Sequence, residues 1–237
     1  MSTKHGKKGD ILLEMKDIRI DGFSDERWHK IIKGIDLTLH RGEVMGLIGE
    51  SGAGKSTLGL ASMGFTKPGC KITSGSVVFD GKDLVTASED EKRSLWGTRI
   101  AYVAQSAAAS FNPAHRLLNQ TVEASLNQNL QSRDLAEADA RNLYKQLQLP
   151  DPENIGDRYP HQVSGGQLQR MMTAMAMSPR PDLIIFDEPT TALDVTTQVE
   201  VLVAMRAIVE KFNTAALYIT HDLAVVAQMA DIIKVLR

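Results

Sequence analysis

The stretch GESGAGKST, residues 49–57, places glycines, a lysine and hydroxyl side chains in the spacing G-x-x-x-x-G-K-[ST]. The backbone N–H groups of such a loop surround phosphate oxygens, Lys55 neutralises the terminal phosphates, and the Ser56 hydroxyl can bind Mg²⁺. The alternative is a glycine-rich turn with an incidental lysine, but the apolar run before the loop and the helical pattern after it favour a phosphate loop. The sequence therefore predicts a nucleotide-binding loop made of Gly49, Glu50, Ser51, Gly52, Ala53, Gly54, Lys55, Ser56 and Thr57.

A second anion-binding pattern, SGGQ, begins a methionine-rich helical segment more than a hundred residues later. A capping serine precedes two glycines that let a ligand approach the backbone closely, and N–H groups point outward at the start of a helix. This pattern predicts a second phosphate contact made of Ser164, Gly165, Gly166 and Gln167. The residues alone do not say why one domain should carry two such contacts.

Two carboxylates, Asp187 and Glu188, follow the apolar run LIIF. An aspartate at the end of a strand can hold Mg²⁺ through its water shell, and the neighbouring glutamate can polarise an attacking water. Two solvated carboxylates at a strand end are the alternative, which a phosphate loop in the same sheet disfavours. The pair therefore predicts a metal ligand at Asp187 and a catalytic base at Glu188.

Two more apolar runs end in polar side chains that fit the same chemistry. Gln105 closes RIAYVAQ and offers a neutral oxygen to Mg²⁺ or to the attacking water. His221 follows AALYIT and can hydrogen-bond to a γ-phosphate. A single Gln or His at the end of a strand is more often a solvated side chain, so the evidence for a site comes from the positions of these two residues at the ends of buried strands. With Lys55, they complete the set of predicted catalytic residues, and Ser56, Gln105 and Asp187 form the predicted metal-binding set.

The elements that must position these residues follow an α/β pattern. Alternating segments at 11–20 and 31–40 predict half-exposed strands, and residues 122–149 carry apolar side chains at helical spacing, including Leu135, Ala138, Leu143 and Leu147. Nearly continuous apolar runs predict buried strands within 41–49, 99–105, 181–189 and 215–222. An open sheet of this kind binds ligands at the carboxyl ends of its strands.

The composition is that of a globular chain of 237 residues, with 43% hydrophobic and 24% charged residues. A net charge of −2 gives no strong field for nucleic acid or an anionic membrane. The single cysteine, Cys70, excludes an intrachain disulfide and any multi-cysteine zinc site. No apolar run approaches the roughly 18 residues of a membrane span, and residues 1–10 are predicted to be a disordered basic tail.

The order of these motifs resembles that of the ATP-binding-cassette (ABC) ATPases: GESGAGKST, Gln105, VSGGQ, LIIFDEP, TALD and ITHD follow one another as in that family. The resemblance runs from Ile11 to the end of the chain, and SGGQ separates this family from other phosphate-loop ATPases. It implies an α/β fold with a phosphate-loop NTPase core and a mixed or parallel sheet. It also implies an N-terminal antiparallel β subdomain and an inserted α-helical subdomain at about 106–178, within one nucleotide-binding domain, 11–237.

The resemblance also implies how the two phosphate contacts are used. Two cassettes of this family meet head to tail, and each ATP lies between the phosphate loop of one and the SGGQ element of the other. Asp194, in TALD, matches a dimer-contact loop, and Gln105 matches the hinge of the helical subdomain. Trp28, beside His29, matches an aromatic side chain that stacks on adenine, with an exposed loop tryptophan as the alternative. The expected ligands are ATP and Mg²⁺.

The segments SFNP, RYPHQVSGGQLQR and DEPTTALDVTTQ resemble the cassettes of peptide, nickel and opine importers. This implies an ATP-hydrolysing subunit that forms a homo- or heterodimer and works with two transmembrane permeases. It also implies indirect action with an extracytoplasmic solute-binding protein, at the cytoplasmic face of the inner cell membrane. Two departures, QSAAAS after Gln105 and Val163 in place of a leucine, remove no catalytic group. The final DIIKVLR resembles the middle of a strand, so a longer native chain is expected.

Two other functions are open to a cassette. A soluble ABC-type ATPase acting on nucleic acid or ribosomes would carry zinc modules, long coiled-coil insertions or basic tracts, whereas this chain has one cysteine and nearly balanced charge. A regulatory module that binds nucleotide without hydrolysing it would need a degenerate Glu188 or His221, and both are intact. The importer subunit is therefore favoured, with no nucleic-acid partner.

Overall fold

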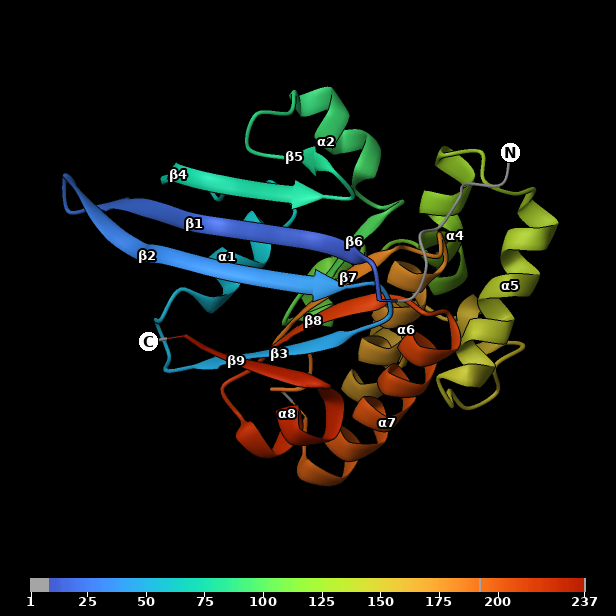
Figure 1. Cartoon of the computed structure of the whole chain (residues 1–237). Helices are drawn as coiled ribbons and strands as arrows, with labels where there is room; N and C mark the ends of the chain where they lie inside the picture. The colour runs from blue at the N-terminus through green and yellow to red at the C-terminus, as the bar shows by residue number, and fades with distance from the viewer. Residues whose placement is uncertain (1–8, 192, 237) are drawn as a thin grey trace. The chain divides into compact units, whose positions relative to one another are not determined.

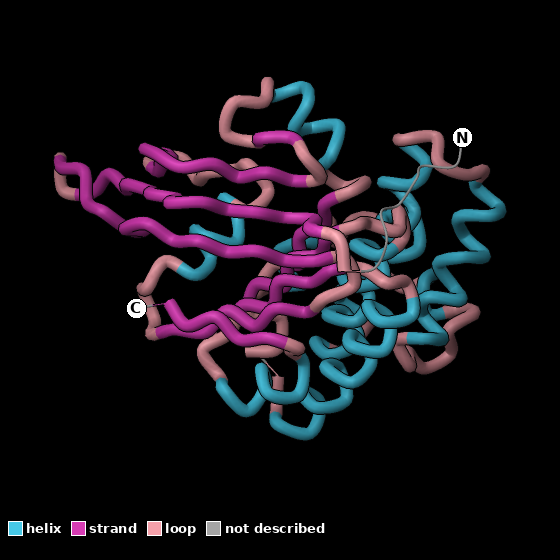
Figure 2. Tube along the Cα trace, in the orientation of Figure 1, coloured by secondary structure: helices cyan, strands magenta, loops and turns pink. Residues whose placement is uncertain are grey.

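The computed structural model describes residues 9–191 and 193–236, and the chain divides into two compact units. The first unit combines Met1–Trp96 with Ala215–Arg237, and the second is Gly97–Thr214. The predicted disordered tail lies outside the described residues except for Gly9 and Asp10, whose backbone groups hydrogen-bond with those of Arg41. Strands dominate the first unit and helices the second (Figure 2).

The first unit begins with an antiparallel sheet in the order β2-β1-β4-β5 (Figure 1). Its strands are β1 (Ile11–Ser24), β2 (Arg27–His40), β4 (Cys70–Phe79) and β5 (Lys82–Asp83). Leu13 and Ile20 of β1 pair with Leu39 and Ile32 of β2, and all four side chains are buried. Apolar side chains on one face of each strand therefore hold this sheet, which confirms the predicted antiparallel β subdomain.

The hairpin that joins β1 to β2 extends further than the alternating pattern predicted. Ser24 pairs with Arg27, and the two turn residues, Asp25 and Glu26, have φ of 49° and 60°. Two consecutive positive φ values are typical of the two-residue turns whose twist matches that of the strands. Because such turns usually contain Asn and Gly, the Asp-Glu pair gave no hairpin signal in the sequence.

Three parallel strands form the rest of the sheet structure in the first unit, with β3 (Val44–Gly49) between β8 (Ala215–Ile219) and β9 (Ile232–Leu236). Helix α1 (Lys55–Ala61) packs on β3 and β8, and α8 (Leu223–Met229) packs on β3. Helix α2 (Glu89–Leu95) lies in the same unit. The buried strands predicted around GLIG and AALYIT are confirmed, and their carboxyl ends lie side by side because Leu47 pairs with Ile219.

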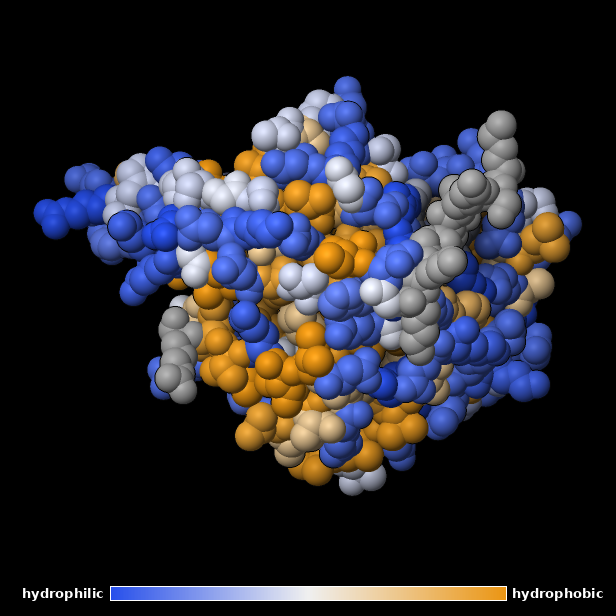
Figure 3. Space-filling model, viewed as in Figure 1, coloured by the Kyte–Doolittle hydropathy of each residue, from blue (hydrophilic) through white to orange (hydrophobic). Residues whose placement is uncertain are grey.

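Apolar side chains gather on the surface of the first unit over α8 and β9 (Figure 3). The exposed ones are Leu223, Ile232, Ile233 and Val235, and Lys234 is the charged residue of β9. Charged side chains usually protect the edge of a sheet against pairing with another chain. One lysine gives β9 little protection of this kind.

In the second unit, β6 (Ile100–Val103) and β7 (Leu183–Asp187) pair in parallel. The helices are α3 (Ala107–Ser110), α4 (Leu117–Asn127), α5 (Arg133–Gln146), α6 (Gly165–Met177) and α7 (Val195–Lys211), with short 3₁₀ turns at Ile155–Asp157 and Pro160–Gln162. Helix α6 contacts β6 and the helices α3, α4, α5 and α7. It therefore forms the centre of this unit.

The helical segment predicted at 122–149 is present as α4 and α5. Leu143 and Leu147 are buried as the spacing predicted, but Leu135 is 62% exposed at the start of α5. Ala138 is exposed as well. The buried residues of α5 are Ala136, Ala140, Leu143 and Tyr144, so the buried stripe of this helix shares only Leu143 with the predicted one. These helices share one compact unit with β6, β7 and α7, and the predicted subdomain boundaries at 106 and 178 stay a prediction.

Candidate functional site

The predicted phosphate loop connects β3 to α1 in the first unit. Gly52 and Gly54 have φ of 82° and 85°, a left-handed conformation that side chains disfavour. Gly54 also lies against β2, since a Cβ there would be 2.8 Å from side-chain atoms of Ile31 and Ile32. Glycine is therefore required at Gly54 by both the backbone conformation and the space, and α1 begins with the next residue, Lys55.

Lys55 is 5% exposed, and its ammonium group is held at the loop. Its Nζ donates to the carbonyl oxygens of Gly49 at 2.9 Å and of Glu50 at 2.8 Å. Carbonyl oxygens orient an ammonium group without cancelling its charge. The loop therefore combines backbone N–H groups with a fixed positive charge, as the binding of a phosphate requires.

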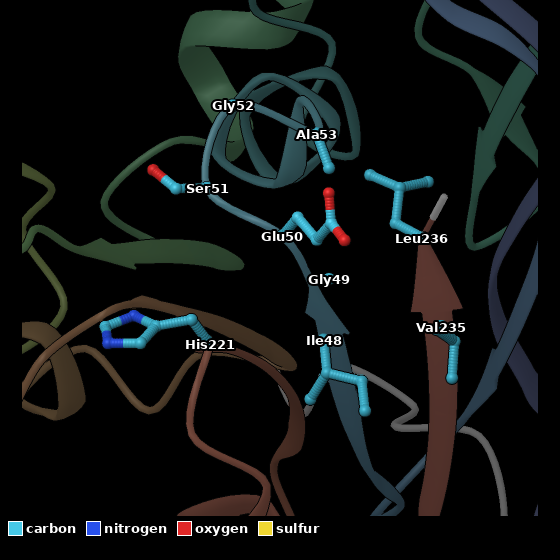
Figure 4. A pocket seen from close by; sticks show the side chains of 9 residues that line it. All are labelled: Ile48, Gly49, Glu50, Ser51, Gly52, Ala53, His221, Val235 and Leu236. Carbon is cyan, nitrogen blue, oxygen red and sulfur yellow. The ribbon is translucent and has the colours of Figure 1, made fainter.

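A cavity of ≈ 800 Å³ lies beside this loop. Its lining comes from the end of β3, from the loop, from β9 and from the segment after β8, and consists of Ile48, Gly49, Glu50, Ser51, Gly52, Ala53, His221, Val235 and Leu236 (Figure 4). The Thr220 N–H donates to the carbonyl of Leu47 at 3.2 Å, so pairing with β3 continues to the residue before His221. The structure thus brings His221 to the phosphate loop, as its place in the sequence predicted.

In the second unit, Asp187 is the last residue of β7, and its side chain is 7% exposed. The hydroxyl of Tyr102 on β6 donates to Oδ2 of Asp187 at 2.5 Å. Burial, and then this hydrogen bond, raise the pKa of Tyr102 well above its usual range, so the hydroxyl stays protonated and remains a donor at neutral pH. Tyr102 was not among the predicted site residues. The signal that could have identified it is a polar hydroxyl in an otherwise apolar strand.

Glu188 follows β7 with a φ of 49°, which is rare for a residue with a side chain and occurs mainly where the surrounding structure holds it. Its Oε2 accepts hydrogen bonds from Thr191 Oγ1 at 3.2 Å and from Gln105 Nε2 at 3.5 Å. Gln105 lies two residues beyond the end of β6. The structure therefore brings Gln105 and Glu188 together, as predicted, and adds Thr191, which the sequence analysis missed.

The SGGQ element forms the first turn of α6 in the second unit. Ser164 Oγ accepts from the N–H of Gln167 at 3.3 Å, and Oε1 of Gln167 accepts from the N–H of Ser164 at 3.0 Å. This reciprocal cap fixes where the helix begins. The two glycines differ: Gly165 is exposed, whereas Gly166 is buried, and a Cβ on Gly166 would lie 2.5 Å from Cγ2 of Thr197 on α7.

Arg170, one turn into α6, ties this turn to the end of α5. Its guanidinium donates to the carbonyl oxygens of Gly166 at 3.3 Å and of Gln148 at 3.0 Å. Arg170 is 8% exposed, and burial lowers its pKa, although the carboxylate of Glu200 opposes this. The last carbonyls of a helix lack partners within it, so Arg170 both caps the end of α5 and holds α6 in place.

Asp194 caps the N-terminus of α7. Its Oδ1 accepts from the N–H of Thr197 at 3.0 Å, and this bond, together with one from the Thr197 side chain, lowers the pKa of the Asp194 carboxyl. Thr197 also packs on Gly166, and a Cβ on Gly165 would lie 3.8 Å from Leu193. The predicted dimer-contact residue therefore lies next to the SGGQ element within the same unit.

Trp28, the predicted adenine platform, lies near the end of the β1–β2 hairpin. Its ring centroid is 5.3 Å from that of Phe23, the Lys71 ammonium lies 3.9 Å from it, and Trp28 is 47% exposed. The residues of β2 that approach the loop are instead Lys30–Ile35, which line a cavity of ≈ 450 Å³ with Gly52, Ala53 and Leu236. Trp28 does not line either cavity beside the loop, and its role stays a prediction.

The predicted metal ligands supply oxygen atoms of the kind that Mg²⁺ prefers: a carboxylate from Asp187, an amide from Gln105 and a hydroxyl from Ser56. Among the described residues, no group of three or more His, Cys, Asp or Glu could hold a metal ion. Mg²⁺ usually binds through one or two protein oxygens together with phosphates and waters. The donor atoms of Asp187 and Gln105 in the second unit, and that of Ser56 in the first, are each of the kind that fits magnesium.

Comparisons with known proteins show the family of this chain. The family model for ABC transporters matches residues 32–191. The chain is 37% identical over 229 residues to the oligopeptide transport ATP-binding protein OppD of Lactococcus lactis subsp. cremoris (strain SK11), covering 97% of this chain and 68% of that protein. The chain belongs to the ABC transporter family. It is also 40% identical over 207 residues to the dipeptide transport ATP-binding protein DppD of Escherichia coli (strain K12), covering 87% of this chain and 63% of that protein.

The fold of this ABC protein is confirmed by a solved structure, that of the dimeric ATP-binding cassette MJ0796 in a post-hydrolysis state bound to ADP and Pi. It matches with a TM-score of 0.82 and 24% identity, covering 95% of this chain and 94% of the other. The family confirms that the chain binds ATP and is an ATPase. In the part of the chain that the structure describes, no helix has the length and apolar character needed to cross a membrane.

Proposed function

We propose that this chain hydrolyses ATP to drive a binding-protein-dependent ABC importer of peptides. The proposal that the chain binds ATP rests on the phosphate loop, which contains the buried Lys55 and lines a cavity together with His221. The peptide cargo is supported by relatives named for oligopeptide and dipeptide transport. Opines and nickel complexes are the other solutes of the importer branch that the sequence resembles.

In the proposed reaction, the loop N–H groups and Lys55 bind the terminal phosphates of ATP, and His221 hydrogen-bonds to the γ-phosphate. Glu188 orients and polarises a water, whose oxygen bonds to the γ-phosphorus as the bond from phosphorus to the ADP oxygen breaks. The proton of the water passes toward the Glu188 carboxylate. Gln105 and Thr191 hold that carboxylate by the hydrogen bonds described above.

Ser56, Gln105 and Asp187 are the residues that would hold Mg²⁺. The ion, when bound, neutralises part of the negative charge on the phosphates. We propose that these residues orient oxygen atoms toward the ion. The position of Asp187 at the carboxyl end of β7 supports this, because ligands of an open α/β sheet bind at the carboxyl ends of its strands.

We assign the SGGQ element to the ATP of a second cassette, in a head-to-tail dimer. Ser164 and Gly165 are exposed at the start of a 13-residue helix, and exposed N–H groups at such a start attract anions. Asp194 lies beside this turn, so both elements can contact one partner. The dimeric state of MJ0796, which shares the fold, supports this assembly.

The proposed complex contains two transmembrane permeases at the cytoplasmic face of the inner membrane and an extracytoplasmic solute-binding protein. The test is co-expression with the permeases and purification in detergent. We expect both permeases to co-purify and ATPase activity to rise when the peptide-loaded binding protein is added, with Glu188→Gln as a variant that assembles but shows no rise. A cassette that purifies alone and is stimulated by nucleic acid or ribosomes would instead support the soluble ATPase, which the relatives do not favour.

A further inference from the structure

Strand β6 brings one hydroxyl to the carboxyl end of β7. Tyr102 pairs with Ile185 in the parallel register of these strands, and its side chain reaches Asp187, two residues further along β7. The Tyr102 hydroxyl lies 2.5 Å from Oδ2 of Asp187. This is the short distance of a hydrogen bond from a hydroxyl to an ionised carboxylate, which is roughly twice as strong as one between neutral groups.

The geometry points to Tyr102 as a positioning residue for Asp187: its hydroxyl holds the carboxylate in the orientation that receives the magnesium of Mg²⁺–ATP. The inference rests on the proposed function, because it requires ATP and Mg²⁺ to bind to this chain. Tyr102 itself contacts neither ligand in this assignment. It acts through Asp187, as residues behind a metal ligand commonly do.

A carboxylate needs such a partner because rotation about the bond to its carboxyl group is soft, with broad rather than sharply defined preferred angles. A hydrogen bond to one oxygen selects one orientation, so the other lone pairs point in fixed directions. Asp187 is 7% exposed, which limits the water that could do the same. The neighbours of Tyr102 in β6, Ala101 and Val103, are buried and apolar, so packing alone does not require a hydroxyl at this place in the strand.

A purely structural role is the competing explanation, in which the bond only fastens β6 to β7. The two roles differ in what they change. Loss of a fastening bond would lower stability and weaken ATP binding whether or not metal is present. Loss of a positioning bond would weaken only the part of binding that depends on the metal.

The test is Tyr102→Phe, which removes the hydroxyl and keeps the ring. ATP affinity is measured by calorimetry in EDTA and in Mg²⁺, and Mn²⁺ affinity is measured by electron paramagnetic resonance with a non-hydrolysable ATP analogue. We expect ATP affinity in EDTA to stay within about two-fold of wild type and Mn²⁺ affinity to fall about ten-fold, the low end for loss of a residue behind a metal ligand.

Tyr144→Phe is the matched control. Tyr144 is also in the second unit, is fully buried, and donates its hydroxyl to Thr121 Oγ1 at 2.7 Å. Its loss should lower stability and leave Mn²⁺ affinity unchanged. In an Asp187→Asn background, Tyr102→Phe should add no further loss of Mn²⁺ affinity, because Tyr102 acts only through the carboxylate of Asp187, which this background lacks.

The outcomes separate the inference from the proposed function. If wild type binds Mg²⁺–ATP and Tyr102→Phe has wild-type Mn²⁺ affinity, the inference is wrong and the function stands. If Tyr102→Phe weakens ATP binding equally with and without metal, the role is structural and the inference is again wrong. If wild type itself does not bind ATP, the proposed function fails first.

Discussion

Replacing Gly166 by alanine should destabilise the protein even though alanine is the better helix former. A Cβ at this position would lie 2.5 Å from Cγ2 of Thr197, whereas carbon atoms in good contact are about 3.5–4.0 Å apart. Overpacking of this kind lowers the free energy of unfolding by about 1–3 kcal/mol, whereas the higher helix propensity of alanine raises it by about 1 kcal/mol. We expect a net loss of about 1 kcal/mol in the free energy of unfolding.

The neighbouring glycine provides the control. A Cβ on Gly165 would meet Leu193 Cδ2 at 3.8 Å, an ordinary contact, so Gly165→Ala should leave stability unchanged or raise it by up to about 1 kcal/mol. The assay is urea denaturation followed by circular dichroism, with Thr197→Ser as the second change. Serine lacks Cγ2 and keeps the hydroxyl that interacts with Asp194.

In this double-mutant cycle, the cost of Gly166→Ala should disappear in the Thr197→Ser background, since the atom that causes the overlap is gone. An equal cost in both backgrounds would refute the packing argument. The packing argument would also be refuted if the Gly166→Ala and Gly165→Ala proteins were equally stable.

Three further predictions concern the chemistry. Glu188→Gln should bind ATP and form a stable dimer with almost no turnover, because an amide cannot polarise water as a carboxylate does; near-normal steady-state hydrolysis would contradict the role of Glu188. His221→Ala should bind ATP but hydrolyse it slowly, and single-turnover rates equal to wild type would exclude His221 from the reaction. Gly165→Asp should fold and bind ATP as a monomer, since an aspartate is favourable at the start of a helix. It should fail to dimerise, because its carboxylate would repel the partner's γ-phosphate. Mixed with Lys55→Ala, it should form crosslinkable dimers, because one composite site collects both defects and the other neither; a mixture without dimers would contradict the shared site.

The proposed site residues could be placed in the fold from the sequence because each belongs to a local pattern. GESGAGKST specifies a strand, a glycine loop and a helix within a few residues, and the structure has all three there. Gln105 and His221 were identifiable because each follows a continuous apolar run, and such a run predicts a buried strand whose carboxyl end can carry a ligand site. A helix cap such as that of Ser164 and Gln167 is equally local, since both partners lie within one turn.

What the sequence did not reveal depends on pairings between distant residues. The bond from Tyr102 to Asp187 exists only because β6 and β7 pair in one register across a separation of 85 residues. Gly166 looked equivalent to Gly165 in SGGQ, and only the packing of α7 makes one buried and the other exposed. The buried stripe of α5 has the same origin, because the neighbouring helices, rather than the spacing of its leucines, decide which side is buried.

Within the second unit, a short segment links the two ends of the proposed chemistry. Thr191 holds Glu188, the N–H of Leu193 donates to the carbonyl of Thr190, and the hydroxyl of Thr190 accepts from Gln198 on α7. Helix α7 in turn packs on Gly166 through Thr197. These contacts form a continuous path from the Glu188 carboxylate to the turn that we assign to the partner's ATP. Since packed interfaces of this kind shift between discrete arrangements rather than deform smoothly, a hydrolysis event at one ATP has a physical route to the other.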